Sequence, residues 1–320
     1  MFGMGKASRT KQAPDRRARI AAQREAARRA QQRKRIYIAG GSILAVVIVV
    51  LAFVLIKANS NNSGSGSNGP TGTALTTLTN QVTGVPVTTQ DKVGAGTVAS
   101  SNFIPASDIS AVSASGGSYF ATVNGSPLTS GGKPEVLYVG AEYCPFCAAQ
   151  RWAMIVSLSR FGTFSGLTTI HSSSTDIDPN TPTFTFYGAK YTSKYVTFTP
   201  VEETTVTEQP LQNPTSAQQA LVAKYDPGSS SGSPIPFIDV GNKYVEVGNL
   251  NAYGPTVLAG KSWSQIAAAL TQPSSTIAKG ILGSANYMTA GICTLTNNQP
   301  ASACTPAIKA LEGNLASSST

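Results

Sequence analysis

Two cysteines, Cys144 and Cys147, are the residues of this 320-residue chain whose type and spacing best suit chemistry. They enclose Pro145 and Phe146, so both sulfurs lie in what we predict to be the first turn of a helix, close enough to form and break a disulfide. Free N–H groups and the positive end of the helix dipole favour a thiolate on Cys144 and lower its pKa. We therefore predict that Cys144 attacks a partner disulfide and that the more shielded Cys147 resolves the mixed disulfide.

The same cysteine spacing occurs in zinc sites, but the sequence lacks the remaining ligands. Such a site needs a second close cysteine pair or histidines, whereas ten residues separate Cys293 from Cys304 and the single histidine is His171. We expect neither a metal nor another cofactor. An exported chain with four cysteines fits two disulfides, so we expect Cys293 and Cys304 to form a structural disulfide that joins the carboxy-terminal helices. A relay, in which this pair exchanges with the first, is the alternative.

The reactive pair is expected to lie where a strand gives way to a helix. Residues 119–123 and 134–140 are β-rich apolar runs, and the second is nearly continuous, as is typical of a strand buried on both faces. Residues 145–161 follow with helical spacing, and Pro145 falls in the first turn, where its missing N–H costs nothing.

Strand and helix patterns alternate along the rest of the chain. Residues 74–118 lack a sustained period and are expected to form a partly irregular lead-in. The remaining predicted elements are a strand at 167–171, an inserted β-hairpin at 183–187 and 194–199, a helix at 215–225, a hairpin at 236–240 and 243–247, and helices at 262–270, 274–288 and 305–315. This order implies an α/β sandwich built around a mixed sheet, with the inserted hairpin and the carboxy-terminal helices as additions.

The net charge of +9 belongs to one end of the chain. Residues 1–35 hold twelve basic and two acidic residues, whereas the remainder holds twelve basic and thirteen acidic residues. Because the basic residues are confined to a tail, we expect no nucleic-acid surface on the main domain.

An uncharged run of 21 residues, 36–56, follows the basic tail. It is long enough to cross a hydrocarbon core of ~30 Å, so we predict a single transmembrane helix that anchors the chain in the cell membrane. Twelve basic residues precede this run, which predicts a cytoplasmic amino terminus and an extracytoplasmic remainder. A cleaved signal peptide is the alternative, although its apolar and basic regions are normally shorter.

Four segments follow from these patterns. They are a basic cytoplasmic tail at 1–35, the transmembrane helix at 36–56, a flexible linker rich in Ser, Gly and Asn at 57–73, and an extracytoplasmic domain at 74–316.

Five stretches of the domain occur in a recognisable order: GAEYCPFCAAQRW (140–152), FGTFSGL (161–167), FTFYGAKYTSKYVTFTPVE (184–202), IPFIDVGNKY (235–244) and ANYMTAGIC (285–293). Together they resemble the domain-of-unknown-function family 929, a thioredoxin-like group, over roughly residues 78–310. The resemblance implies a thioredoxin-like sandwich with disulfide exchange at Cys144 and Cys147. Thioredoxins keep a buried acid six residues before the first cysteine, and this chain departs from them by having Tyr138 there.

Ile235 and Pro236 precede a predicted strand about ninety residues after the cysteines. In a thioredoxin-like fold this loop faces the cysteine pair, and the main chain of the residue before the proline pairs with an extended substrate segment. We therefore predict a cis peptide bond between Ile235 and Pro236, with an ordinary trans proline that opens a strand as the alternative. Substrate contact is assigned to these two residues together with Pro145 and Phe146.

The resulting hypothesis is a membrane-anchored, extracytoplasmic thiol-disulfide oxidoreductase. Its expected partners are the thiols or disulfides of exported proteins, with a membrane redox partner that restores the pair. The alternative is a redox-inert binding or assembly module that keeps the same fold with structural disulfides and uses the insertion at 183–199 as a contact surface.

Overall fold

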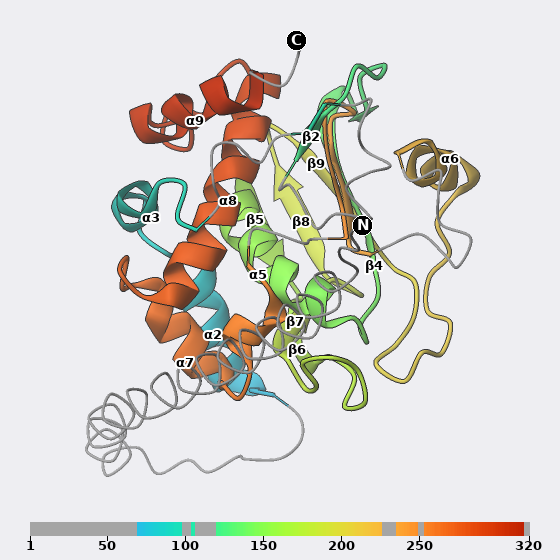
Figure 1. Ribbon diagram of the computed structural model, residues 1–320, viewed down its shortest axis with the longest axis vertical. Coiled ribbons are helices and arrows are strands. Elements are labelled where there is room, and N and C mark those ends of the chain that lie inside the picture. The colour runs from blue at the N-terminus through green and yellow to red at the C-terminus, as the bar shows by residue number, and fades with distance from the viewer. Residues whose placement is uncertain (1–68, 98–103, 106–119, 226–234, 249–252, 317–320) are drawn as a thin grey trace, which may run out of the picture. The chain divides into compact units, whose positions relative to one another are not determined.

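The computed structural model describes residues 69–97, 104–105, 120–225, 235–248 and 253–316 (Figure 1). The α-helices in this part of the chain are α2 (Gly72–Thr83), α3 (Val87–Val93), α5 (Pro145–Ser159), α6 (Ser216–Tyr225), α7 (Trp263–Leu270), α8 (Thr276–Leu295) and α9 (Pro306–Ala316), and a short 3-10 helix, η2, spans Pro255–Leu258. The strands are β1 (Ile104–Pro105), β2 (Ala121–Thr122), β3 (Thr129–Ser130), β4 (Lys133–Gly140), β5 (Gly162–Ser165), β6 (Thr168–His171), β7 (Pro182–Thr185), β8 (Lys190–Ser193), β9 (Thr197–Glu202), β10 (Phe237–Val240) and β11 (Tyr244–Val247). The molecule is thus a mixed α/β protein.

The largest sheet is mixed, and β4 is its longest strand. Its strands follow the order β1-β2-β11-β10-β4-β3, and β9 also pairs with β4. β9 runs parallel to β4, whereas β10 runs antiparallel to it on the other side. β4 therefore has a neighbour on both edges, as far as Val139 on the β10 side and as far as its last residue, Gly140, on the β9 side.

Alternate residues of β4 serve two separate hydrophobic cores. Val136 and Tyr138 pack in a core with residues of α5 and α8. Leu137 and Val139 pack in a second core with Val222 of α6. Figure 1 shows the sheet nearly edge-on, with α6 on one face and α5 and α8 on the other. This two-faced burial explains why β4 is a continuous apolar run in the sequence.

The predicted strand-to-helix junction is confirmed. β4 ends at Gly140, and α5 begins at Pro145 after a short turn. Cys144 is the N-cap of α5, and Pro145 occupies the first turn, where its fixed φ favours helix initiation. The helix is buried along most of its length because α8, β7, α2, β5 and η2 pack around it.

The predicted inserted hairpin is wrong. β7 pairs with β6, β8 pairs with β5, and β9 joins the main sheet beside β4. The alternating pattern marked two of these strands correctly, but period-2 alternation carries no information on which strand is the partner. β8 was not anticipated from the pattern.

The irregular lead-in predicted for residues 74–118 is also partly wrong, because α2 and α3 lie within or overlap it. Leu75, Leu78 and Val82 of α2 are spaced as one helix face and pack in the α5 core. The many threonines between them obscured this period in the sequence.

The other predicted helices and the second predicted hairpin agree with the structure, whereas β1, β3, β5 and η2 were not predicted. α6, α7 and α9 begin and end within about two residues of their predicted bounds, and α8 continues seven residues beyond its own. The hairpin of β10 and β11 turns at Gly241 and Asn242, which both have positive φ, as a tight hairpin of this type requires.

The predicted transmembrane helix, residues 36–56, lies outside the described residues. Within the described part of the chain, no helix combines the length and the apolar character needed to cross a membrane.

Candidate dithiol site

Cys144 and Cys147 are free thiols at the start of α5. The backbone N–H of Cys147 donates a hydrogen bond to the Cys144 sulfur, at 3.2 Å, so the sulfur caps the helix in place of a side-chain oxygen. The Cys144 thiol in turn donates to the carbonyl oxygen of Ile235, at 3.7 Å. The nucleophile predicted from the sequence therefore faces the predicted proline loop.

The peptide bond between Ile235 and Pro236 is cis, as predicted. Ile235 is half-buried and Pro236 is buried. Between the cysteines, Pro145 is buried and Phe146 is half-buried. The structure thus brings Cys144 and Ile235 together, and the substrate contacts assigned to these four residues stay a prediction.

Cys147 lies deeper than Cys144. Cys147 is fully buried, whereas 4% of the surface of Cys144 is exposed to solvent. The predicted difference in shielding is confirmed, although Cys144 itself is more enclosed than an open nucleophile would be.

The two thiols have opposite acidities. Burial raises the pKa of Cys144, but hydrogen bonds from the Cys147 thiol and from backbone N–H groups, together with the Arg151 charge, bring the pKa below its ordinary value. Burial and the hydrogen bond that Cys147 gives to Cys144 raise the pKa of Cys147 well above its ordinary value. Cys144 is therefore the thiol that ionises first.

Tyr138 lies directly behind the dithiol. A Cβ added to Gly140 would fall 2.2 Å from the Tyr138 hydroxyl and 3.1 Å from the Cys147 sulfur, so glycine makes room for both groups. The Tyr138 hydroxyl is buried without a hydrogen-bond partner in the described structure. Burial raises the pKa of this phenol well above its ordinary value, so it stays protonated. The neutral phenol of Tyr138, which can donate a hydrogen bond, thus occupies the position at which thioredoxins have a buried acid.

Arg151 forms a buried ion pair behind the same site. Its guanidinium donates to both carboxylate oxygens of Glu202, at 2.9 and 2.7 Å, and to the carbonyl oxygen of Ala141, at 2.7 Å. Both side chains are fully buried. The Arg151 guanidinium carbon also lies 5.9 Å from the centre of the Tyr138 ring. The positive charge of Arg151 lies close enough to favour the thiolate form of both cysteines, although burial keeps the pKa of Cys147 above its ordinary value.

A cavity of about 350 Å³ adjoins the reactive centre on the α6 face of the sheet. Tyr143, which precedes Cys144, and Ile235, which accepts the hydrogen bond from its thiol, line the cavity. Val222 of α6 and Phe237 of β10 contribute apolar walls. The cavity offers space beside a cysteine that is otherwise almost covered.

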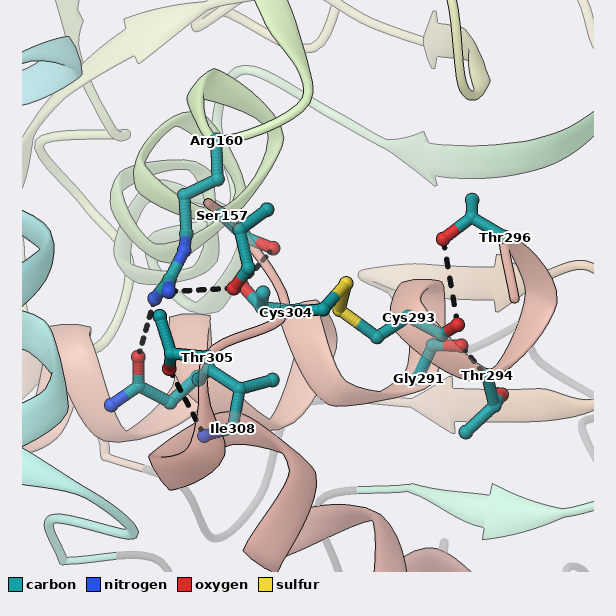
Figure 2. Close-up of a disulfide and its surroundings, with 12 residues drawn as sticks. Ser157, Arg160, Gly291, Cys293, Thr294, Thr296, Cys304, Thr305 and Ile308 are labelled. Carbon is teal, nitrogen blue, oxygen red and sulfur yellow. Dashed lines mark hydrogen bonds between the residues drawn. A yellow bond between two sulfur atoms is a disulfide. The ribbon is translucent and has the colours of Figure 1, made fainter. Parts of the chain in front are cut away.

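Cys293 and Cys304 form the predicted disulfide (Figure 2). It joins α8 to the segment before α9, and the Arg160 side chain donates to the carbonyl oxygen of Ala303 beside it, at 2.7 Å. Arg160 caps the carboxyl end of α5, whereas Cys144 caps the opposite end. A helix of 15 residues is about 22 Å long, so the two cysteine pairs are too far apart for direct exchange in this conformation.

No group of three or more His, Cys, Asp or Glu side chains is placed to hold a metal ion within the described residues. The His171 ring packs against Trp263, with 4.4 Å between ring centroids.

Sequence reasoning missed Glu202 and the cavity. Arg151 follows Cys147 by four residues and so shares its helix face, which is a signal for their proximity. Nothing local links Glu202 to either residue, because it reaches the site only through the parallel pairing of β9 with β4.

These features define a mixed α/β protein with a buried pair of thiols at the start of a helix. The family model described as a domain of unknown function (DUF929) matches residues 119–294, which is more than half of the chain. The chain belongs to this family, as the resemblance of its motifs indicated. Searches of the curated proteins and of the solved structures found no match.

Proposed function

We propose that this protein is a membrane-anchored, extracytoplasmic thiol-disulfide oxidoreductase with a thioredoxin-like domain, and that it acts on exported proteins. The observation that carries the proposal is the contact between Cys144 and the Ile235 carbonyl. The Cys144 thiol has a lowered pKa and caps the helix. Its hydrogen bond brings it next to a backbone carbonyl group that is able to pair with a substrate chain.

The order of elements supports a thioredoxin-like fold. β4, α5, β9, α6, the hairpin of β10 and β11, and α8 occur in this order, with β5 to β8 between α5 and β9 and with η2 and α7 before α8. Strand, helix, strand, helix, hairpin and helix is the order that we expect of such a sandwich, although β9 and not the predicted strand at 167–171 takes the place beside β4. The dithiol follows β4, and the proline loop precedes the hairpin.

The chemistry requires only the two thiols and a partner disulfide. The Cys144 thiolate attacks one partner sulfur, forms a mixed disulfide and releases the other partner sulfur as a thiolate. Cys147 then loses its proton and attacks the Cys144 sulfur, which releases the second partner thiolate. The partner gains two electrons, and the Cys144–Cys147 pair is left as a disulfide that a membrane thiol donor reduces again. The same steps in reverse oxidise a partner dithiol.

Ionisation of Cys144 also prepares the substrate contact. As a thiol, Cys144 donates to the Ile235 carbonyl. As a thiolate it has no proton to donate, so the carbonyl oxygen becomes available to a backbone N–H of an extended substrate segment. The positive charge of Arg151, held by Glu202, favours the thiolate of either cysteine.

The membrane location rests on the sequence. The uncharged run at 36–56 follows a basic segment, and the positive-inside rule then directs the domain outward.

Trapping of mixed disulfides tests the proposed function. In a Cys147→Ala variant the resolving thiol is absent, so partners should accumulate on Cys144 as covalent complexes that a reductant releases. The matched control is Cys144→Ala/Cys147→Ala, which should trap none. Equal trapping by both variants, or none by either, would reject the proposal.

A redox-inert binding module is the second candidate, and the 4% exposure of Cys144 is the observation that favours it. In that case both thiols would stay unreactive in the folded protein. The contact surface once expected at 183–199 would have to differ from a hairpin, because these strands pair with three separate neighbours.

A further inference from the structure

The cavity beside Cys144 has a carboxylate in its lining. Among the described residues that line it, Glu203, which directly follows β9, is the single charged one. The Glu203 side chain is half-buried, and burial raises the pKa of its carboxyl group. Within the described residues, no hydrogen bond or ion pair to its carboxylate is present. A partly buried acid without a counter-ion is a costly arrangement unless something else pairs with it.

A second polar group in the cavity also lacks a partner. The hydroxyl of Thr204, which lines the same space, is buried and makes no hydrogen bond in the described structure. Buried hydroxyls are normally hydrogen-bonded. Glu203 and Thr204 are thus adjacent lining residues whose side-chain oxygens have no partner in the described structure.

The rest of the lining is largely apolar. Val139, Val222 and Phe237 belong to the second hydrophobic core and form walls of the cavity. A side chain that fits must combine an apolar stem with a positively charged, hydrogen-bond-donating end. Lysine and arginine have this combination.

The position of the cavity indicates where this side chain comes from. Tyr143 and Ile235 line the cavity. Tyr143 directly precedes Cys144 in the chain, and the carbonyl oxygen of Ile235 accepts a hydrogen bond from the Cys144 sulfur. A substrate whose sulfur reaches Cys144 and whose main chain follows Ile235 brings a residue near its cysteine to the cavity.

We propose that this cavity is a specificity pocket for a lysine or arginine next to the reacting cysteine of the substrate. The ammonium or guanidinium group pairs with Glu203 and donates to Thr204, while the methylene stem lies on the apolar walls. The inference rests on the proposed function, because it assigns a substrate class to the same site. An aliphatic side chain would leave Glu203 unpaired, and an acidic one would add a like charge.

Peptide disulfides with one varied neighbour test the pocket. The reduced full-length protein is mixed with glutathionylated peptides that carry Lys, norleucine or Glu next to the cysteine, and the rate of their reduction is measured. We expect the Lys peptide to react faster than the norleucine peptide by about tenfold, the factor that a modest charge-assisted hydrogen bond provides. Glu203→Gln should remove this preference.

A matched variant controls for charge. Glu208→Gln makes the same charge change at an exposed position five residues further on, and it should keep the Lys preference. Glu208→Gln should also reduce hydroxyethyl disulfide, which has no side chain for the pocket, at the wild-type rate. Equal rates for the Lys and norleucine peptides in the wild type, or a Lys preference that survives in Glu203→Gln, would overturn the pocket.

Failure of the proposed function has a different signature, namely no reduction of any disulfide, hydroxyethyl disulfide included. The pocket is then decided by binding. Peptides with Ser in place of Cys should bind the wild type more tightly with Lys than with norleucine by calorimetry, and Glu203→Gln should abolish the difference. Equal affinities would reject the pocket independently of any exchange activity.

Discussion

At the scale of single residues, Cys144 and Cys147 differ because one caps the helix and the other lies within it. The Cys144 sulfur receives backbone N–H groups that have no partner within the helix, and these hydrogen bonds favour its thiolate. Cys147 has its own N–H committed to that sulfur and is closed off from solvent. Two positions in one helical turn thus give one thiol with a lowered pKa and one with a raised pKa.

Arg151 and Glu202 should matter for stability as well as for thiol acidity. Arg151→Met removes one partner of a fully buried ion pair and leaves Glu202 as an unpaired buried charge. We expect this to lower the free energy of unfolding by about 3–5 kcal/mol, measured by urea unfolding.

The double variant Arg151→Met/Glu202→Leu is the matched control. It removes both charges, so it should recover a large part of the loss. A double variant no more stable than Arg151→Met would contradict the explanation by an uncompensated charge.

The sequence predicts the residues that act through local geometry. Cys144 follows from its place before a helix, and the cis bond at Ile235–Pro236 follows from the family resemblance. Tyr138 was placed at the site by the resemblance to thioredoxins. Glu202 and Glu203 could not be predicted, because their relation to the cysteines depends on strand pairing.

At the scale of elements, the hairpin of β10 and β11 contains a buried acid. One oxygen of the fully buried Asp239 accepts the backbone N–H of Asn242 in the turn, and the other has no partner in the described structure. Burial, opposed by the Asn242 N–H, raises the pKa of Asp239 to about 7. The hairpin that positions Ile235 therefore contains, in β10, a carboxyl group of Asp239 that is neutral in the folded protein under acidic conditions.

This raised pKa predicts a pH-dependent stability. Unfolded Asp has a pKa of ~3.9, so between about pH 4 and 7 the folded state binds more protons than the unfolded state and stability falls as the pH rises. The contribution from Asp239 should be fully present below about pH 4 and lost by about pH 7, with a total of about 4 kcal/mol.

Asp239→Asn tests this contribution, because an amide keeps the acceptor for Asn242 and does not titrate. Urea unfolding of both proteins from pH 4 to 8 should show that the variant gains stability relative to the wild type as the pH rises. A difference between the two proteins that does not change with pH would contradict the raised pKa.

Element prediction succeeded where the pattern is local and failed where pairing is distant. β4, α5 and the hairpin of β10 and β11 each carry their own period or turn signal. β7, β8 and β9 lie close together in the sequence but pair with β6, β5 and β4 respectively. Short alternating strands separated by small turns resemble a hairpin until their tertiary partners are known.

At the scale of the whole molecule, the sheet separates two environments around the dithiol. The α5 face holds the buried Arg151, Glu202 and Tyr138 behind Cys147, and the α6 face holds the cavity beside Cys144. The proposed reaction uses both: the buried charge favours the thiolate, and the cavity admits the substrate. The second disulfide lies at the far end of α5 and takes no direct part.

Site-resolved alkylation of the reduced full-length protein measures whether Cys144 is an accessible thiol with a lowered pKa. Iodoacetamide labelling is followed by mass spectrometry from pH 4 to 10, with Cys144 and Cys147 quantified separately. We expect Cys144 to be labelled with a midpoint pH below the ~8.5 of an ordinary thiol and Cys147 to stay unlabelled in the folded protein. Labelling of Cys144 only above about pH 8.5, or no labelling until the protein unfolds, would contradict this expectation.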